Sequence, residues 1–149
     1  MAIPSPGDGT RRPLGPVTPS ASPGVTAPVL LVVEDDAAMR DMLAKMLGVT
    51  YTVFVAPDGV TALEILAQIK APDGIVLDVM MPRIDGFELA RRIKADPRLQ
   101  RVPILFLTAK TAALDVIAGI NAGARHYVTK PFKMPDLLAR LDRMIGPRA

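Results

Sequence analysis

Short runs with strand character alternate five times with segments of helical spacing, and this alternation limits the chain to few folds. The first run, Val29–Val33, is continuously apolar, as expected for a strand that is covered on both faces. Strands that are linked in sequence through helices form a parallel sheet by right-handed crossovers. The sequence therefore predicts one α/β domain of the (βα)5 type. The predicted strands are 29–33, 51–55, 75–77, 104–107 and 125–129.

Apolar residues between the strands recur at the spacing of amphipathic helices. After the first strand they stand at i, i+3, i+4, i+7 and i+8, which predicts a helix with one apolar face. They are Met39, Met42, Leu43, Met46 and Leu47. We interpret these methionines as core residues, and Gly48 as the residue that ends the helix. Asp36 and Asp58 each precede a helical segment and are predicted to cap it. Further helices are predicted over 87–94, over 111–122 and from about Pro135 onward.

The N-terminal part of the chain differs in composition from the rest. Its first 28 residues hold 7 of the 15 prolines and 4 of the 11 glycines. Such a segment buries too little surface to offset the entropy lost on ordering, so we predict a disordered tail over 1–27. The folded domain is expected over 28–146 and a short tail over 147–149. No apolar run reaches the length of a signal-peptide core or a membrane span, and we expect a cytoplasmic protein with no membrane partner.

The composition excludes several kinds of active site. The 149 residues include no cysteine, which excludes a disulfide framework, thiol catalysis and a cysteine-bound metal. His126 is the one histidine, so a metal site built from several histidines is excluded as well. The formal net charge is only +3, and we therefore predict no nucleic-acid partner.

Polar side chains stand at the ends of four predicted strands. Glu34 and Asp35 follow the first, Asp78 the third, Thr108 the fourth and Lys130 the fifth. In an open parallel sheet all of these ends lie at one edge, which is where ligands bind. Clustered carboxylates need a counter-charge, and hard oxygen donors suit Mg²⁺. A carboxylate beside Mg²⁺ can act as a nucleophile toward phosphorus, while a hydroxyl and an ammonium group hold the phosphoryl oxygens. The residues therefore predict a Mg²⁺-dependent phosphoryl-transfer site.

Several motifs of the chain resemble those of the receiver domains of two-component response regulators, including single-domain regulators of the chemotaxis type. They are Leu30-Leu-Val-Val-Glu-Asp-Asp36, Leu77-Asp-Val-Met-Met-Pro82 with Asp85-Gly86, Leu107-Thr-Ala109, Asn121-Ala-Gly-Ala124 and Tyr127-Val-Thr-Lys-Pro-Phe132. Each motif alone is weak, but the ordered set is highly specific and spans about residues 28–146. The resemblance implies a flavodoxin-like fold with strand order 2-1-3-4-5 and a cis peptide bond between Lys130 and Pro131.

The resemblance also implies the roles of the site residues. Asp78 would accept a phosphoryl group from a histidine kinase or a phosphotransfer protein, and Thr108 and Lys130 would contact that group. Tyr127 would turn inward when Thr108 moves, so these two residues would form the conformational switch. The groups implied to hold Mg²⁺ are the carboxylates of Glu34, Asp35 and Asp78 and the main-chain carbonyl of Met80.

The predicted helix over 111–122 is unusually apolar on its outward side. Leu114, Val116 and Ala118 are expected to be exposed there, close to Tyr127 on the last strand. Contiguous exposed apolar side chains usually mark a contact surface, so we predict that this face binds a downstream protein or a second copy of the chain. The alternative is that an alanine-rich composition leaves a face without a function.

We expect a stand-alone signalling domain rather than an enzyme. It would assist its own phosphorylation and dephosphorylation and would signal by binding a partner. Three alternatives remain: a phosphorylation-independent docking module, the receiver part of a longer regulator, and a Mg²⁺-dependent phosphohydrolase of another aspartyl-phosphate family. Phosphohydrolases of that kind typically use Asp-x-Asp, whereas Met80 stands two residues after Asp78 in this chain.

Overall fold

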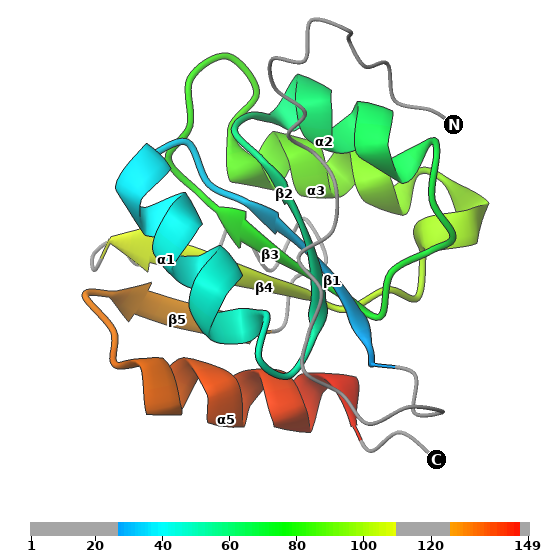
Figure 1. Cartoon of the computed structure of the whole chain (residues 1–149). Helices are drawn as coiled ribbons and strands as arrows, with labels where there is room; N and C mark the ends of the chain where they lie inside the picture. Colours follow the sequence, from blue (N-terminus) through cyan, green and yellow to red (C-terminus); the bar gives the residue numbers. More distant parts are fainter. Residues whose placement is uncertain (1–26, 110–125, 147–149) are drawn as a thin grey trace, which may run out of the picture.

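A single parallel sheet of five strands forms the centre of the molecule (Figure 1). The computed structural model describes residues 27–109 and 126–146. The strand order β2-β1-β3-β4-β5 is the one predicted for a flavodoxin-like fold. The strands are β1 (Val29–Val33), β2 (Thr52–Ala56), β3 (Gly74–Asp78), β4 (Ile104–Ala109) and β5 (His126–Lys130). Because β1 and β3 are neighbours, their carboxyl ends lie side by side, and β5 lies at an edge of the sheet.

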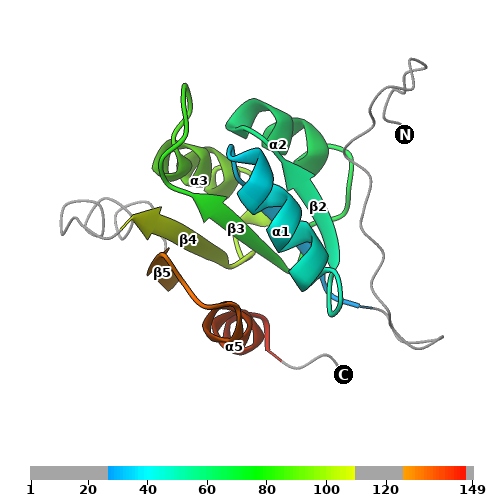
Figure 2. The ribbon, with the colours of Figure 1, turned by 60° about the vertical axis from the view of Figure 1, so that its left-hand side comes forward.

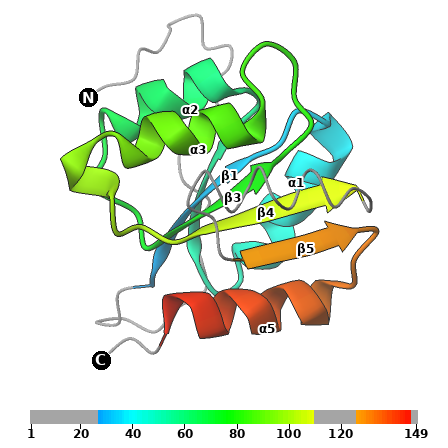
Figure 3. The same cartoon turned by 180° about the vertical axis from the view of Figure 1, so that it is seen from behind.

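Helices cover both faces of the sheet. The described ones are α1 (Ala37–Leu47), α2 (Gly59–Leu66), α3 (Gly86–Lys94) and α5 (Met134–Ile145), with a 3-10 turn η1 (Pro97–Leu99). Helices α2 and α3 pack on one face, and α1 and α5 pack on the other (Figures 1 and 3). Figure 2 shows α5 next to β5, on the side of the sheet away from α2 and α3. None of these helices is long and apolar enough to cross a membrane.

Alternate residues of each strand supply the two halves of the core. Leu31 and Val33 of β1 pack toward α2 and α3, whereas Leu30 and Val32 pack toward α1 and α5. All of them are fully buried. A strand that is covered on both faces has no polar side, which explains why β1 is a continuous apolar run.

The structure confirms the predicted first helix but contradicts the predicted burial of two of its methionines. Leu43 and Leu47 are fully buried against the sheet, and Met39 is partly buried beside them. Met42 and Met46 are instead exposed, at 39% and 46%. Helix α1 contacts the sheet through the row of residues at i, i+4 and i+8, so the row at i+3 and i+7 points to solvent.

Strand β2 begins one residue later than predicted, because Tyr51 belongs to the turn that precedes it. The N–H of Tyr51 donates to the carbonyl of Leu47 (2.8 Å), and its hydroxyl donates to Oδ1 of Asp142 on α5 (2.6 Å). At the same end of the sheet, the N–H of Val29 donates to Oδ2 of Asp73 (2.8 Å). These hydrogen bonds fasten the amino ends of β1 and β2, opposite the edge where the polar residues stand.

The predicted helix caps are confirmed. Oδ2 of Asp36 accepts the N–H of Met39 (2.8 Å) at the start of α1, and Oδ1 of Asp58 accepts the N–H of Thr61 (2.7 Å) at the start of α2. Helix α1 ends at Leu47, immediately before Gly48 as predicted. The sequence pattern thus fixes where these helices begin, and with them the loop that carries the acidic residues after β1.

Three predictions lie outside the described residues. The helix predicted over 111–122, with Leu114, Val116 and Ala118, falls within 110–125. The predicted N-terminal tail falls within 1–26 except for Ala27, which is buried. The predicted C-terminal tail is 147–149.

Candidate functional site

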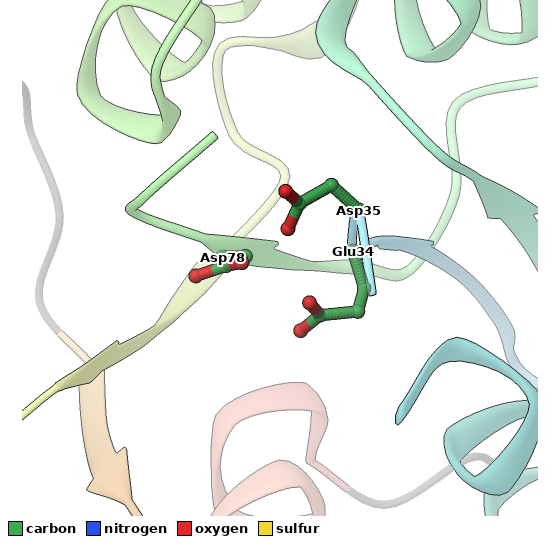
Figure 4. A group of neighbouring side chains, drawn as sticks. All are labelled: Glu34, Asp35 and Asp78. Carbon is green, nitrogen blue, oxygen red and sulfur yellow. The ribbon is translucent and has the colours of Figure 1, made fainter. Parts of the chain in front are cut away.

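The carboxyl ends of β1 and β3 bring three carboxylates together, as the sequence predicts. Glu34 and Asp35 follow β1, and Asp78 is the last residue of β3. One carboxylate oxygen from each side chain lies within 4.8 Å of the others (Figure 4). Glu34 and Asp78 are buried, whereas Asp35 is exposed. The cluster is therefore accessible from the Asp35 side.

Asp78 lies in surroundings that disfavour its ionised form. Burial is the larger cause and the charge of Glu34 the second, and they raise the pKa of Asp78 to about 7 although the Lys130 ammonium group lowers it. The N–H of Met80 donates to Oδ1 of Asp78 (3.2 Å) and also lowers this pKa. A bound cation would lower the pKa of Asp78 and so favour its ionised form, which is the nucleophilic one.

Lys130 brings a positive charge from β5 to the two buried acids. Its Nζ lies 3.2 Å from Oε1 of Glu34 and 3.4 Å from Oδ1 of Asp78. Burial lowers the pKa of Lys130, but the charges of Asp78 and Glu34 outweigh burial and the net shift is upward. Lys130 is therefore a cation, and the bond to Pro131 that follows it is cis, as predicted.

Thr108 lies near the end of β4, on the strand that neighbours β3. In the sheet Asp78 pairs with Leu107, so Thr108 stands one residue further toward the carboxyl edge. It is buried, and its hydroxyl donates to the carbonyl of Ala109 (3.1 Å). The side chain is thus held at the edge where the acids meet, while its contact with a phosphoryl group stays a prediction.

Tyr127 connects β5 to the aromatic residues of the core. It pairs with Phe106 in the sheet, and their ring centroids are 5.7 Å apart. Phe106 in turn meets Phe87 of α3 edge to face, with ring centroids 4.9 Å apart. Burial raises the pKa of Tyr127, so its hydroxyl is neutral at physiological pH. The ring is half-buried beside Phe106, and its movement as a switch stays a prediction.

Met80 belongs to the loop that leaves β3. Its main chain is next to the cluster, because its N–H contacts Asp78, while its side chain is 66% exposed. The role predicted for its carbonyl as a metal ligand is untested by these contacts and stays a prediction.

Arg40 is a site residue that the sequence analysis missed. Its Nη1 donates to the main-chain carbonyl of Glu34 (3.0 Å) and lies 3.4 Å from the carbonyl of Asp35. The guanidinium group thus binds the loop between β1 and α1 on which both acids stand. The sequence indicated this role only through the position of Arg40 on the first turns of α1, five residues after Asp35. A side chain that binds main-chain carbonyls needs no particular residue type at the positions it contacts, so no motif marks the contact.

Gly86 was part of a motif, but its physical role emerges only in the structure. Its N–H donates to the carbonyl of Val79 (3.0 Å). A Cβ atom at this position would lie 2.4 Å from the main-chain oxygen of Asp78 and 2.9 Å from Cα of Val79. The start of α3 therefore packs directly on the backbone of the central acid, with no space for a side chain.

The donor set of the cluster fits a magnesium ion. Mg²⁺ prefers hard oxygen ligands, uses few carboxylates and keeps several water molecules. The three carboxylates each offer an oxygen within 4.8 Å of the others, so one ion can lie among them, and the exposed Asp35 side admits water.

Comparisons with known proteins agree with this site. The family model for the response regulator receiver domain matches residues 30–142 of the chain. A curated relative is the response regulator MprA of Mycobacterium ulcerans (strain Agy99), which is 45% identical over 117 residues. The match covers 78% of the chain and 49% of that relative. The chain thus spans about half the length of the curated relatives it matches.

Solved structures with the same fold include two receiver-type proteins. The receiver domain of sensor histidine kinase PA1611 from Pseudomonas aeruginosa PAO1 has a TM-score of 0.74 at 32% identity, covering 82% of this chain and 100% of that one. It was crystallised with a magnesium ion coordinated in its active-site cleft. Chemotaxis protein CheY4 of Vibrio cholerae has a TM-score of 0.75 at 31% identity, covering 80% and 99%.

Proposed function

Because the chain belongs to the family of response regulator receiver domains, we propose that Asp78 accepts a phosphoryl group from a histidine kinase or a phosphotransfer protein in a two-component system. The observation that carries the proposal is the position of Asp78, which is buried, lies beside Glu34 and Asp35 and contacts Lys130. Both oxygens of Glu34 already accept hydrogen bonds, from Lys130 and from the N–H of Asp36. Asp35 is exposed, which leaves Asp78 as the acid best placed to react.

The contacts of Asp78 suggest which of its two carboxylate oxygens attacks phosphorus. Lys130 and the N–H of Met80 both contact Oδ1, so we assign the attack on phosphorus to Oδ2. As the Oδ2–phosphorus bond forms, the bond from phosphorus to the donor breaks, and its electron pair leaves with the donor. Lys130 and Thr108 stabilise the phosphoryl oxygens.

Glu34, Asp35, Asp78 and the carbonyl of Met80 would hold Mg²⁺. When bound, Mg²⁺ supplies positive charge that neutralises the transferring group. The chain itself orients Asp78 and keeps it partly desolvated, which assists both its own phosphorylation and the later hydrolysis of the acyl phosphate. It acts as a signalling domain rather than as an enzyme with a separate substrate.

Output is proposed to occur by phosphorylation-dependent binding of a partner, through the predicted helix 111–122 together with β5 and α5. Thr108 pairs with Thr129 in the sheet, so a change at Thr108 is adjacent to β5. Tyr127, on the same strand, packs against Phe106 of β4. Phosphorylation of Asp78 would shift these residues between two arrangements. A partner that binds one arrangement better than the other would then bind in a phosphorylation-dependent way. The phosphorylation-independent docking module and the receiver part of a longer regulator remain the alternatives.

Treatment with acetyl phosphate and Mg²⁺, followed by intact-mass measurement, tests the proposal. The protein should gain the mass of one phosphoryl group, and the gain should require Mg²⁺. The Asp78→Asn variant should gain nothing, because an amide is not a usable nucleophile here. Asp85→Asn is the matched control, since Asp85 caps α3 in the same loop and is exposed. A gain that persists in Asp78→Asn, or its absence from the parent, would contradict the proposal, and the second result would favour the docking module.

A further inference from the structure

A groove runs between β5 and the helix that follows it, α5. Its volume is about 590 Å³. Figure 3 shows β5 at the edge of the sheet with α5 alongside it. Residues of β5, of the turn after it and of α5 line the groove, among them Val128, Phe132, Asp136, Ala139, Arg140 and Arg143. It begins beside Lys130, so it adjoins the proposed phosphorylation site.

The rim of the groove carries three positive charges and one negative charge. On α5, Asp136, Arg140 and Arg143 are spaced i, i+4 and i+7, so they share one face of the helix. Lys133 stands at the N-cap of the same helix. Within 27–109 and 126–146, no carboxylate forms an ion pair with Lys133, Arg140 or Arg143. The cations extend over about 15 Å along α5, and Asp136 leaves this row of charges with a net positive charge.

Between these charges the groove offers apolar surface. Val128 and Phe132 are half-buried and pack against the core on the α1 and α5 side. Ala139 of α5 is exposed and also lines the groove. A ligand that fits this lining carries carboxylates to meet the cations and apolar side chains to meet Phe132 and Val128.

We propose that this groove binds a short acidic segment of a partner protein, one that alternates carboxylate and apolar side chains. The inference rests on the proposed function, because β5 and α5 belong to the face assigned to output. It adds the chemistry of the partner, which the face alone does not define.

Charge argues against a second copy of the chain as the occupant. A two-fold dimer places the same surface patch against itself. The patch has three cations, Lys133, Arg140 and Arg143, and one acid, Asp136, so it would then face a patch of the same net positive charge. Like charges held together across an interface oppose association.

The groove also fits a peptide better than a nucleic acid. Asp136 stands among the cations and would repel a uniformly charged phosphate backbone. The whole chain has a net charge of only +3, which is a weak attraction for a polyanion. A peptide can place an uncharged or basic residue opposite Asp136 and carboxylates elsewhere.

Fluorescence anisotropy with a labelled synthetic peptide that alternates glutamate and leucine tests the inference on the full chain. Arg140→Glu with Arg143→Glu should weaken binding by at least about tenfold, since attraction becomes repulsion at two positions. Lys70→Glu with Arg101→Glu is the matched control, because it changes the net charge equally at exposed positions outside the groove. The control should bind the peptide like the parent. A peptide with lysine in place of glutamate should bind at least about tenfold more weakly than the acidic one.

Three results would overturn the inference: equal loss of binding in both double variants, equal affinity for the acidic and basic peptides, or tighter binding of a duplex oligonucleotide than of the acidic peptide. A dimer in light scattering that the groove variant abolishes would also overturn it, in favour of a second copy.

Intact mass after acetyl phosphate treatment separates this inference from the proposed function. The groove variant should still be phosphorylated on Asp78, and loss of peptide binding with normal phosphorylation supports the groove assignment. Failure of the parent to be phosphorylated while the peptide still binds would contradict the proposed function alone.

Discussion

Gly86 is the residue at which a single added methyl group would disturb Asp78 most directly. A Cβ would meet the main-chain oxygen of Asp78 at 2.4 Å, and backbone cannot move aside as a side chain can. We expect Gly86→Ala to lower the free energy of unfolding by about 3 kcal/mol. It should also slow phosphorylation of Asp78 by about tenfold or more, because the nucleophile is displaced. Urea unfolding and intact-mass time courses with acetyl phosphate measure the two effects.

Gly59→Ala is the control for this substitution. Its Cβ would meet only the side chain of Ile84, at 3.2 Å, and alanine suits the first turn of α2. The free energy of unfolding should change by no more than about 1 kcal/mol, with normal phosphorylation. Equal stability and equal phosphorylation rates for Gly86→Ala and the parent would show that the loop after β3 absorbs the methyl group.

Arg40 holds the loop of the acidic cluster through its main chain rather than through the acids themselves. Arg40→Lys keeps the positive charge, but its side chain is one atom shorter than that of the arginine, whose Nη1 reaches two successive carbonyls. We expect Mg²⁺ affinity to fall by about threefold or more, because Glu34 and Asp35 are no longer held in place. Isothermal titration of Mg²⁺ into the unphosphorylated protein measures this without any phosphoryl transfer.

Arg92→Lys, on the exposed face of α3, is the matched control and should bind Mg²⁺ like the parent. Since both variants preserve net charge, a weaker affinity in Arg40→Lys alone reports geometry. An affinity equal to the parent's would show that the loop is held by its other contacts.

At the scale of elements, Tyr51 joins the turn before β2 to α5 through its hydrogen bond to Asp142. Burial, followed by that hydrogen bond and the Asp142 charge, raises the pKa of Tyr51 above its usual value. The neutral hydroxyl is therefore favoured in the folded state, and this contribution is complete below about pH 10. Above that pH the unfolded chain loses the proton first, so stability declines as pH rises. The decline continues until the pH exceeds the raised pKa of the folded state.

The Tyr51→Phe variant should consequently lose less stability than the parent at high pH. At about pH 8 it should be less stable by about 1 kcal/mol, because one hydrogen bond is lost. By about pH 11 the difference should shrink by about 1 kcal/mol. Urea unfolding at both pH values measures it, and Tyr127, whose pKa is also raised, is present in both proteins and cancels. A difference that is constant with pH would show that Tyr51 titrates equally in both states.

The elements also show where sequence reasoning reached its limit. Spacing predicted α1 correctly, but the same spacing fits both rows of its apolar residues, and only packing decides that Leu43 is buried and Met42 exposed. Tyrosine is common in strands, yet the N–H of Tyr51 donates to the carbonyl of Leu47 and not to a neighbouring strand. Both errors concern how an element is oriented or bounded, which depends on contacts with distant parts of the chain.

For the whole molecule, the site was more predictable than the details of the helices. Parallel strands align their carboxyl ends, so acids and a lysine at several strand ends have to converge, as Glu34, Asp78 and Lys130 do. The strand order itself came from the resemblance to receiver domains, since alternation of strands and helices does not determine it. Arg40 and Gly86 could not be predicted from residue types, because each acts on main-chain atoms.

The division of the core by the sheet has an evolutionary consequence. Residues that hold the fold together point into two buried layers, whereas Arg140 and Arg143 lie outside both layers on the surface of α5. Substitutions at such surface positions usually change stability by no more than about 0.5 kcal/mol. Descendants of one such domain can therefore change the surface of α5 by a few mutations while they keep the fold and the acidic cluster, and duplicated copies can diverge there without first acquiring stabilising mutations.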